Sequence, residues 1–209
     1  DATGKNGAVA SSSYYASKAG LDILQAGGNA VDAAIAVAYT LGVVEPYTSG
    51  LGGGGFMTIY DAETKSVKVV DFREIAPANA TPEMWLNDEG KVAKFVDASG
   101  KEFTGDYSKL NQVGGMASAV PGEVAGLEYV LSNFGSGKIT RAELMQPAID
   151  LAENGYIVTL TMKQCTEDEY FEVANMPEVA GYYLDENGLP LEVGTVLTNK
   201  DLAKTYRMI

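Results

Sequence analysis

The sequence predicts an α+β fold, because it contains both buried-helix and alternating-strand patterns. Residues 30–41 are almost wholly apolar and small, which is typical of a buried, closely packed helix. Residues 56–60 and 66–72 alternate in polarity around a polar turn, which indicates a β-hairpin. Apolar side chains then recur at helical spacing between residues 124 and 134. Together these patterns indicate a fold that contains both helices and sheet.

The first part of the chain carries clear start and stop signals. Residues 7–11 are small and β-permissive and predict a first strand, and residues 14–26 predict a helix. Two glycines then supply the left-handed stop, and Asn29 is a favourable N-cap for the apolar helix that follows. The single charge of that helix, Asp32, lies in the first turn, where the helix dipole favours an anion.

The middle of the chain has a weaker pattern. Between residues 76 and 112 regular periodicity is lost, apart from a predicted short helix at 82–86, and residues 87–109 predict a surface excursion. Pro121 is suited to the first position of the next helix, which runs to Phe134.

The last part of the chain predicts further helices. Thr140 and Glu143 form a capping-box pattern for a helix that ends at residues 154–155. A polar helix around residues 163–168 and a turn-rich segment at 177–195 follow. Thr198 is predicted to cap a last helix, and its pattern reaches Ile209 without a stop signal, so we expect further sequence beyond that residue.

Composition excludes several classes of function. The formal net charge of −13 argues against a surface that binds DNA or RNA. The chain contains no histidine, which excludes Ser-His-Asp and Cys-His catalysis within it and removes the commonest zinc ligand. Cys165 is the single cysteine, and we interpret it as an incidental thiol on a polar helix. No apolar run is long enough to span a bilayer, and the N-terminus lacks a signal-peptide pattern.

Two motifs resemble cofactor-binding signatures but lie in the wrong context. Residues 50–55 satisfy G-x-G-x-x-G, yet a helix precedes the glycines and a strand follows, the reverse of a dinucleotide fingerprint. We therefore interpret this glycine loop as a turn or close-approach element. Tyr14 and Lys18 match the Y-x-x-x-K segment of short-chain dehydrogenases, but only thirteen residues precede Tyr14, too few for the cofactor-binding half of that family.

The best functional candidate is the charged group at residues 71–74, directly after the second strand pattern. A rigid strand delivers Arg73 there, and a guanidinium can bind a carboxylate through two parallel hydrogen bonds. The alternative is an arginine that only pairs with Glu74 or Asp71. The residues alone leave both interpretations open.

Six blocks of the sequence, in order, closely resemble the γ-glutamyltranspeptidase family. They are GGNAVDAA at 27–34, GLGGGGF at 50–56, DFREIAP at 71–77, AVPGEVAGL at 119–127, QPAIDLAENG at 146–155 and LTNKDLA at 197–203. The resemblance implies an N-terminal nucleophile hydrolase with a four-layer αββα sandwich. Members are made as one precursor that cleaves itself into a large N-terminal and a small C-terminal subunit.

Under this resemblance, residues 1–209 are a single-domain portion of the large subunit, incomplete without the C-terminal small subunit. The new N-terminal threonine of the small subunit, outside this chain, attacks the γ-glutamyl amide. Arg73 matches the family arginine that binds the substrate α-carboxylate, and Glu74 is a candidate to orient it. We assign no catalytic residue in this chain, no metal and no organic cofactor, and no oxyanion role to the glycine loop.

The resemblance therefore implies a γ-glutamyl transferase or glutathione hydrolase, which transfers the acyl group to water or to an amino acid or peptide acceptor. Poly-γ-glutamate and acylated β-lactams are alternative substrates within the family. A non-catalytic scaffold that kept the fold is a further alternative, and a self-cleaving, threonine-led segment downstream would distinguish it from an enzyme. The family also suggests a periplasmic or extracellular location.

Overall fold

The computed structural model describes residues 3–97, 99–103 and 108–209, and its chain divides into two compact units. The first unit comprises Asp1–Glu74, Pro121–Val158 and Gly194–Ile209, and the second comprises Ile75–Val120 and Thr159–Val193. The fold mixes helices with short antiparallel sheets, so the α+β prediction is confirmed. The prediction that the chain is one portion of a single domain stays a prediction.

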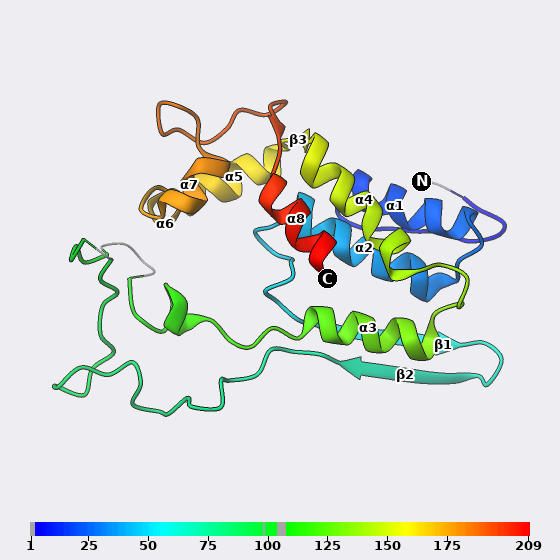
Figure 1. Cartoon of the computed structure of the whole chain (residues 1–209), viewed down its shortest axis with the longest axis horizontal. Helices are drawn as coiled ribbons and strands as arrows, with labels where there is room; N and C mark the ends of the chain where they lie inside the picture. The colour runs from blue at the N-terminus through cyan, green and yellow to red at the C-terminus, as the bar shows by residue number, and fades with distance from the viewer. Residues whose placement is uncertain (1–2, 98, 104–107) are drawn as a thin grey trace. The chain divides into compact units, whose positions relative to one another are not determined.

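The core of the first unit is built around helix α2 (Ala30–Val44), as the apolar run predicts. Helix α1 (Tyr14–Gln25) and helix α4 (Arg141–Asn154) both pack on α2, and helix α8 (Lys200–Met208) packs on α4 (Figure 1). Three large side chains of α2 are each only 1% exposed: Ile35, Tyr39 and Val43. Small residues fill the positions between them and allow close helix packing.

The N-terminus of α2 is fixed by a buried carboxylate. Asn29 accepts the backbone N–H groups of Val31 and Asp32, as expected for its capping position. Asp32 is fully buried, and its Oδ2 accepts the N–H of Asn29 at 2.9 Å and that of Ser136 at 3.2 Å. Asp32 thus joins the start of α2 to the connection that precedes α4, a role beyond the dipole effect that its position predicts.

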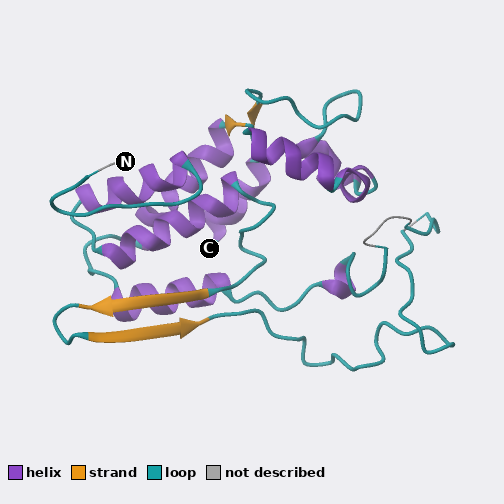
Figure 2. Cartoon of the chain, turned by 180° about the vertical axis from the view of Figure 1, so that it is seen from behind, coloured by secondary structure: helices purple, strands orange, loops and turns teal. Residues whose placement is uncertain are grey.

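The β-hairpin forms as predicted. Strand β1 (Phe56–Asp61) pairs with strand β2 (Ser66–Asp71) in an antiparallel register that sets Phe56 opposite Asp71. Helix α3 (Glu123–Phe134) runs alongside the hairpin (Figure 2). Four large apolar side chains of the hairpin are 60–64% exposed: Phe56, Tyr60, Val67 and Val69. In this register all four lie on the same face, because alternate residues of paired strands share a face.

Helix α8 is anchored through a pair of tyrosines. Strand β3 (Tyr156–Ile157) pairs with strand β4 (Val196–Leu197), and this pairing leads the chain into α8. The Tyr206 ring meets the Tyr39 ring edge-on at 5.9 Å, and its hydroxyl donates to the Tyr39 carbonyl at 2.9 Å. Asn199, not the predicted Thr198, caps the helix by accepting the N–H of Leu202.

The second unit consists of irregular chain and short helices. Its helical segments are η1 (Gly115–Ala117), α5 (Leu160–Asp168), α6 (Tyr170–Ala174) and α7 (Pro177–Tyr183). The predicted excursion at 87–109 is irregular but anchored, because Phe103 is 3% exposed and packs edge-on against Phe95 and Phe171. Residues 98 and 104–107 of that prediction lie outside the described residues. Across the described residues, every helix is too short or too polar to cross a bilayer.

Four local predictions were wrong. Residues 7–11 are not a strand, because a β-permissive segment needs a partner strand to complete its hydrogen bonds. Residues 82–86 form turns in place of a helix and end in a bridge between Leu86 and Val92. Helix α3 begins at Glu123, not at Pro121. The turn-rich segment at 177–195 begins with helix α7.

Replacing Asp32 with asparagine is expected to destabilise the folded protein by about 2 kcal/mol. An amide nitrogen would face one of the backbone N–H groups that the carboxylate now accepts, leaving a buried donor unpaired. The urea unfolding midpoint of the full-length protein measures the effect. The matched control is Asp22→Asn, because Asp22 is exposed and pairs with Lys18 across the helix surface. Equal midpoints for the two variants would contradict the role of Asp32.

Candidate functional site

Arg73 lies immediately after β2, on backbone that is still held to the hairpin. The Phe72 N–H donates to the Gly55 carbonyl at 2.9 Å, and the Gly55 N–H donates to the Phe72 carbonyl at 3.3 Å. The ladder therefore continues one residue pair past the end of the strands. The Arg73 N–H then donates to the Asp71 carboxylate at 3.0 Å. Both interactions fix the direction in which the Arg73 side chain leaves the backbone.

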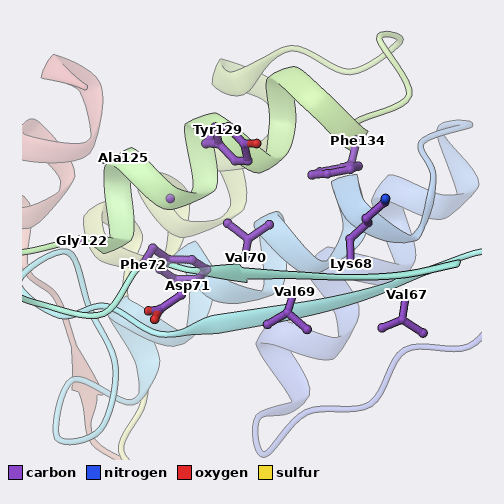
Figure 3. Close-up of a pocket in the computed structure, with 11 residues that line it drawn as sticks. Val67, Lys68, Val69, Val70, Asp71, Phe72, Gly122, Ala125, Tyr129 and Phe134 are labelled. Atoms are coloured by element: carbon purple, nitrogen blue, oxygen red, sulfur yellow. The ribbon is translucent and has the colours of Figure 1, made fainter.

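Glycines enclose Phe72 on both sides. A Cβ atom placed on Gly54 or on Gly122 would overlap the Phe72 carbonyl oxygen. A Cβ atom on Gly126 would overlap the Phe72 ring. Figure 3 shows Phe72 at the end of β2, beside the start of α3 near Gly122. Helix α3 and the glycine loop can approach the strand end this closely only because these positions carry no side chain.

The Arg73 side chain is held without being buried. Its Nε atom lies 3.1 Å from Glu74 Oε2 in an ion pair, while the Arg73 side chain is 61% exposed and that of Glu74 24% exposed. The pairing with Glu74 that the sequence left open is therefore present. The Asp71 carboxylate instead accepts the backbone N–H of Arg73. A 61% exposed guanidinium keeps surface with which to bind an anion.

The glycine loop is a tight turn, as predicted. The Gly53 N–H donates to the Gly50 carbonyl at 2.9 Å. The Gly53 carbonyl in turn accepts the N–H groups of Gly122 and Glu123 at 2.9 and 3.0 Å. These two donors belong to the N-terminus of α3, where a helix has unpaired N–H groups. The loop thus starts helix α3, which explains why the helix begins after Pro121.

Glu123 is a functional candidate that the sequence did not reveal. It is 7% exposed, and its Oε1 atom has no hydrogen-bond partner among the described residues. Burial is the main reason that its pKa is raised to about 7; the Gly50 N–H opposes this shift, and the Glu74 carboxylate adds to it. A glutamate in a first helical turn ordinarily indicates only a dipole interaction, so sequence position alone carried no signal of this burial.

A groove lies beside this site, between β2 and α3. It has a volume of about 660 Å³, and its lining is mostly apolar, with Val70, Phe72, Ala125, Tyr129 and Phe134 among its residues (Figure 3). In Figure 3, Val70 points toward α3, whereas Val67 and Val69 point away from it. Arg73 and Glu123 do not line the groove.

The remaining sequence candidates have ordinary surroundings. Lys18 pairs with Asp22 one helical turn away, at 2.5 Å, which fits a helix surface. Cys165 is a half-buried free thiol on helix α5. Within the ranges that the structure describes, no group of histidine, cysteine, aspartate and glutamate side chains is arranged to hold a metal ion.

Comparisons with known proteins identify relatives over nearly the whole chain. A family model described as gamma-glutamyltranspeptidase matches residues 16–209. A glutathione hydrolase proenzyme from Bacillus subtilis (strain 168) is 40% identical over 206 residues, which are 99% of this chain and 32% of that protein. An acylase ACY 1 proenzyme from Pseudomonas sp. (strain V22) is 39% identical over 210 residues, covering 100% of this chain and 35% of that protein. The chain thus spans about a third of the length of these relatives.

A solved structure has the same fold. The crystal structure of Helicobacter pylori gamma-glutamyltranspeptidase aligns with a TM-score of 0.87 and 34% identity, over 100% of this chain and 55% of that one. The N-terminal nucleophile hydrolase class predicted from the resemblance is therefore confirmed.

Replacing Gly126 with alanine is expected to destabilise the protein by roughly 1–3 kcal/mol, because the new methyl group must displace the Phe72 ring. Thermal or urea unfolding of the full-length protein measures this loss. Gly52→Ala is the matched control, since a Cβ atom there meets nothing within 4 Å and its backbone is not left-handed. If the two variants unfold alike, the close packing around Phe72 does not matter for stability.

Proposed function

Because the chain belongs to the gamma-glutamyltranspeptidase family, we propose that it is part of an enzyme that cleaves γ-glutamyl amides, with Arg73 as its carboxylate-binding residue. The observation that carries this proposal is the position of Arg73. Its backbone is fixed by the Phe72–Gly55 pair and by Asp71, and its side chain is 61% exposed. This combination suits a residue that binds a small anionic ligand without rearranging.

The proposed role of Arg73 is to bind and orient the substrate. A γ-glutamyl compound carries an α-carboxylate at a fixed distance from its reactive γ-amide. A guanidinium that donates two parallel hydrogen bonds to this carboxylate fixes both position and rotation. The amide is then presented in one orientation to the nucleophile. Glu74, 3.1 Å from Arg73 Nε, would keep the guanidinium in place before substrate binds.

The chemical step in this proposal is carried out outside the chain. The N-terminal threonine of a C-terminal small subunit attacks the γ-amide carbon, and its own α-amine accepts the hydroxyl proton. The amide nitrogen takes that proton and leaves as an amine, and an acyl-enzyme ester remains. Water, or the amine of an amino acid or peptide, then attacks that ester and releases the product. The proposed chemistry uses no metal and no organic cofactor.

The exposed face of the hairpin supports the proposed subunit partner. Phe56, Tyr60, Val67 and Val69 gather exposed apolar side chains on one face, which is unusual for a surface that stays in water. Relatives at about 40% identity are roughly three times as long as this chain and are named proenzymes. We propose that the C-terminal subunit of the same precursor covers this face. The family also suggests a periplasmic or extracellular site of action.

A second candidate function is hydrolysis of another acyl amide. The relative named acylase ACY 1 proenzyme is 39% identical, almost as similar as the glutathione hydrolase proenzyme at 40%. Identity at this level therefore does not separate a glutathione-like substrate from an acylated β-lactam or poly-γ-glutamate. A protein that never cleaves itself and releases no amine from any of these compounds would instead be a scaffold.

Replacing Arg73 with alanine is expected to lower kcat/KM for a chromogenic γ-glutamyl anilide by about 100-fold, mainly through a higher KM. A 100-fold loss corresponds to about 2.7 kcal/mol, which lies within the roughly 1.5–3 kcal/mol that a hydrogen bond to a charged group contributes. Arg73→Lys should recover only part of the loss. A lysine ammonium keeps the positive charge but cannot donate the two parallel hydrogen bonds of a guanidinium. The assay uses the matured full-length protein.

The matched control is Arg141→Ala, because Arg141 forms an exposed ion pair with Glu128 on the helix surface. It should retain wild-type kinetics. An active wild type whose KM is unchanged by Arg73→Ala would exclude the role of Arg73. A matured but inactive wild type would favour the acylase alternative.

A further inference from the structure

Glu123 is unusual because a buried carboxyl group has an oxygen without a partner. The residue is 7% exposed, and Oε1 accepts no hydrogen bond from the described residues. Buried acids are almost always paired with a cation or with several donors. An unpaired charge at this position would cost more free energy than a neutral carboxylic acid.

A second carboxyl group lies close to Glu123 across the glycine loop. The position where a Gly53 Cβ would lie is 3.6 Å from Glu74 Oε1 and 3.9 Å from Glu123 Oε2. Glu74 is itself in ion-pair contact with Arg73, at 3.1 Å. Arg73, Glu74 and Glu123 therefore form one charged cluster at the end of β2, with a single cation among the described contacts.

The other groups that face Glu123 do not neutralise it. The Gly50 N–H donates to it and favours its charged form. Burial raises the pKa of Tyr39 on α2 to about 12 and also raises the pKa of Tyr206 on α8, and the Glu123 charge adds to both shifts. Both phenols therefore stay neutral near pH 7 and supply no charge. The balance of charge in the cluster depends on Glu123.

We propose that Glu123 is a positioning residue whose protonation controls how strongly Arg73 binds a substrate carboxylate. This inference rests on the proposed function of Arg73. With Glu123 neutral, the charges of Arg73 and Glu74 cancel, and an incoming carboxylate meets no net repulsion. With Glu123 ionised, the cluster carries one net negative charge and repels that carboxylate. Substrate binding in turn favours the protonated form of Glu123, because the coupling is reciprocal.

The direction of the pH effect follows from these charges. The pKa of Glu123 is about 7, so the group becomes charged as the pH rises through neutrality. The affinity for the carboxylate should therefore fall as the pH rises through about 7. Glu123→Gln keeps the shape and the acceptor for the Gly50 N–H but cannot ionise. This variant should behave at every pH as the wild type does at low pH.

The test compares KM for a γ-glutamyl anilide between about pH 5.5 and 8.5, in the matured wild type and in Glu123→Gln. The readout is the wild-type KM divided by the KM of Glu123→Gln. Titration of the substrate's own amine affects both values equally and cancels in this ratio. We expect a ratio near one at the acidic end and a rise of about three- to tenfold at the alkaline end. The midpoint of the rise should lie near 7.

Glu128→Gln is the matched control, since it removes a carboxylate from the same helix that is 46% exposed and paired with Arg141. Its KM ratio to the wild type should not change with pH. A Glu123→Gln ratio that is equally flat would overturn the inference and would show that Glu123 is only structural. Unfolding is monitored by circular dichroism and by precursor cleavage.

Glu74→Gln supplies a second test that leaves Glu123 in place. The Glu74 carboxylate raises the pKa of Glu123. Removing that carboxylate should therefore shift the midpoint of the rise of KM with pH to a lower pH. An unshifted midpoint would overturn the inference.

Failure of the proposed function gives a different result. If Arg73→Ala leaves KM unchanged, the carboxylate-binding role is wrong, and infrared difference spectra of wild type minus Glu123→Gln then decide the state of Glu123. A protonated carboxyl band that persists at about pH 6 supports the inferred titration. Its absence at that pH overturns it.

Discussion

The close approach of backbone around Phe72 is the constraint on which the rest of the site depends. Three chain segments meet there: the end of β2, the glycine loop and the start of α3. Side chains at Gly54, Gly122 or Gly126 would collide with Phe72. The same contacts place the Gly53 carbonyl on the first N–H groups of α3, so packing and helix capping support each other. As a result, the end of β2 is rigid and holds Arg73 in an exposed position.

The electrostatics of the site follow from this packing. Starting α3 against the glycine loop buries its first residue, Glu123, beside Glu74. Glu74 pairs with Arg73, whereas burial and the nearby Glu74 carboxylate raise the pKa of Glu123. The Tyr206 hydroxyl of α8 donates to the Tyr39 carbonyl and lies next to Gly42, which in turn lies close to Gly50 of the glycine loop. The helical core and the charged cluster are therefore parts of one packed arrangement.

Local signals predicted much of the fold, and tertiary contacts account for the rest. The Asn29 cap, the Thr140–Glu143 capping box and the hairpin follow from short-range chemistry, and the structure confirms each of them. The strand predicted at 7–11 failed because strand formation depends on a partner, which the segment itself does not encode. The site likewise contains one residue that local sequence predicts and one that depends on tertiary contacts. Arg73 could be selected from its place after a strand, but the burial of Glu123 depends on contacts from residues more than fifty positions away.

A crystal structure of the matured full-length protein with bound L-glutamate would test the central claim most directly. The account predicts that the Arg73 guanidinium donates two hydrogen bonds of about 2.9 Å to the ligand α-carboxylate. It also predicts that the backbone of residues 71–74 keeps its contacts with Gly55 and Gly122. A ligand carboxylate bound by another cation, with Arg73 still paired only to Glu74, would contradict the account.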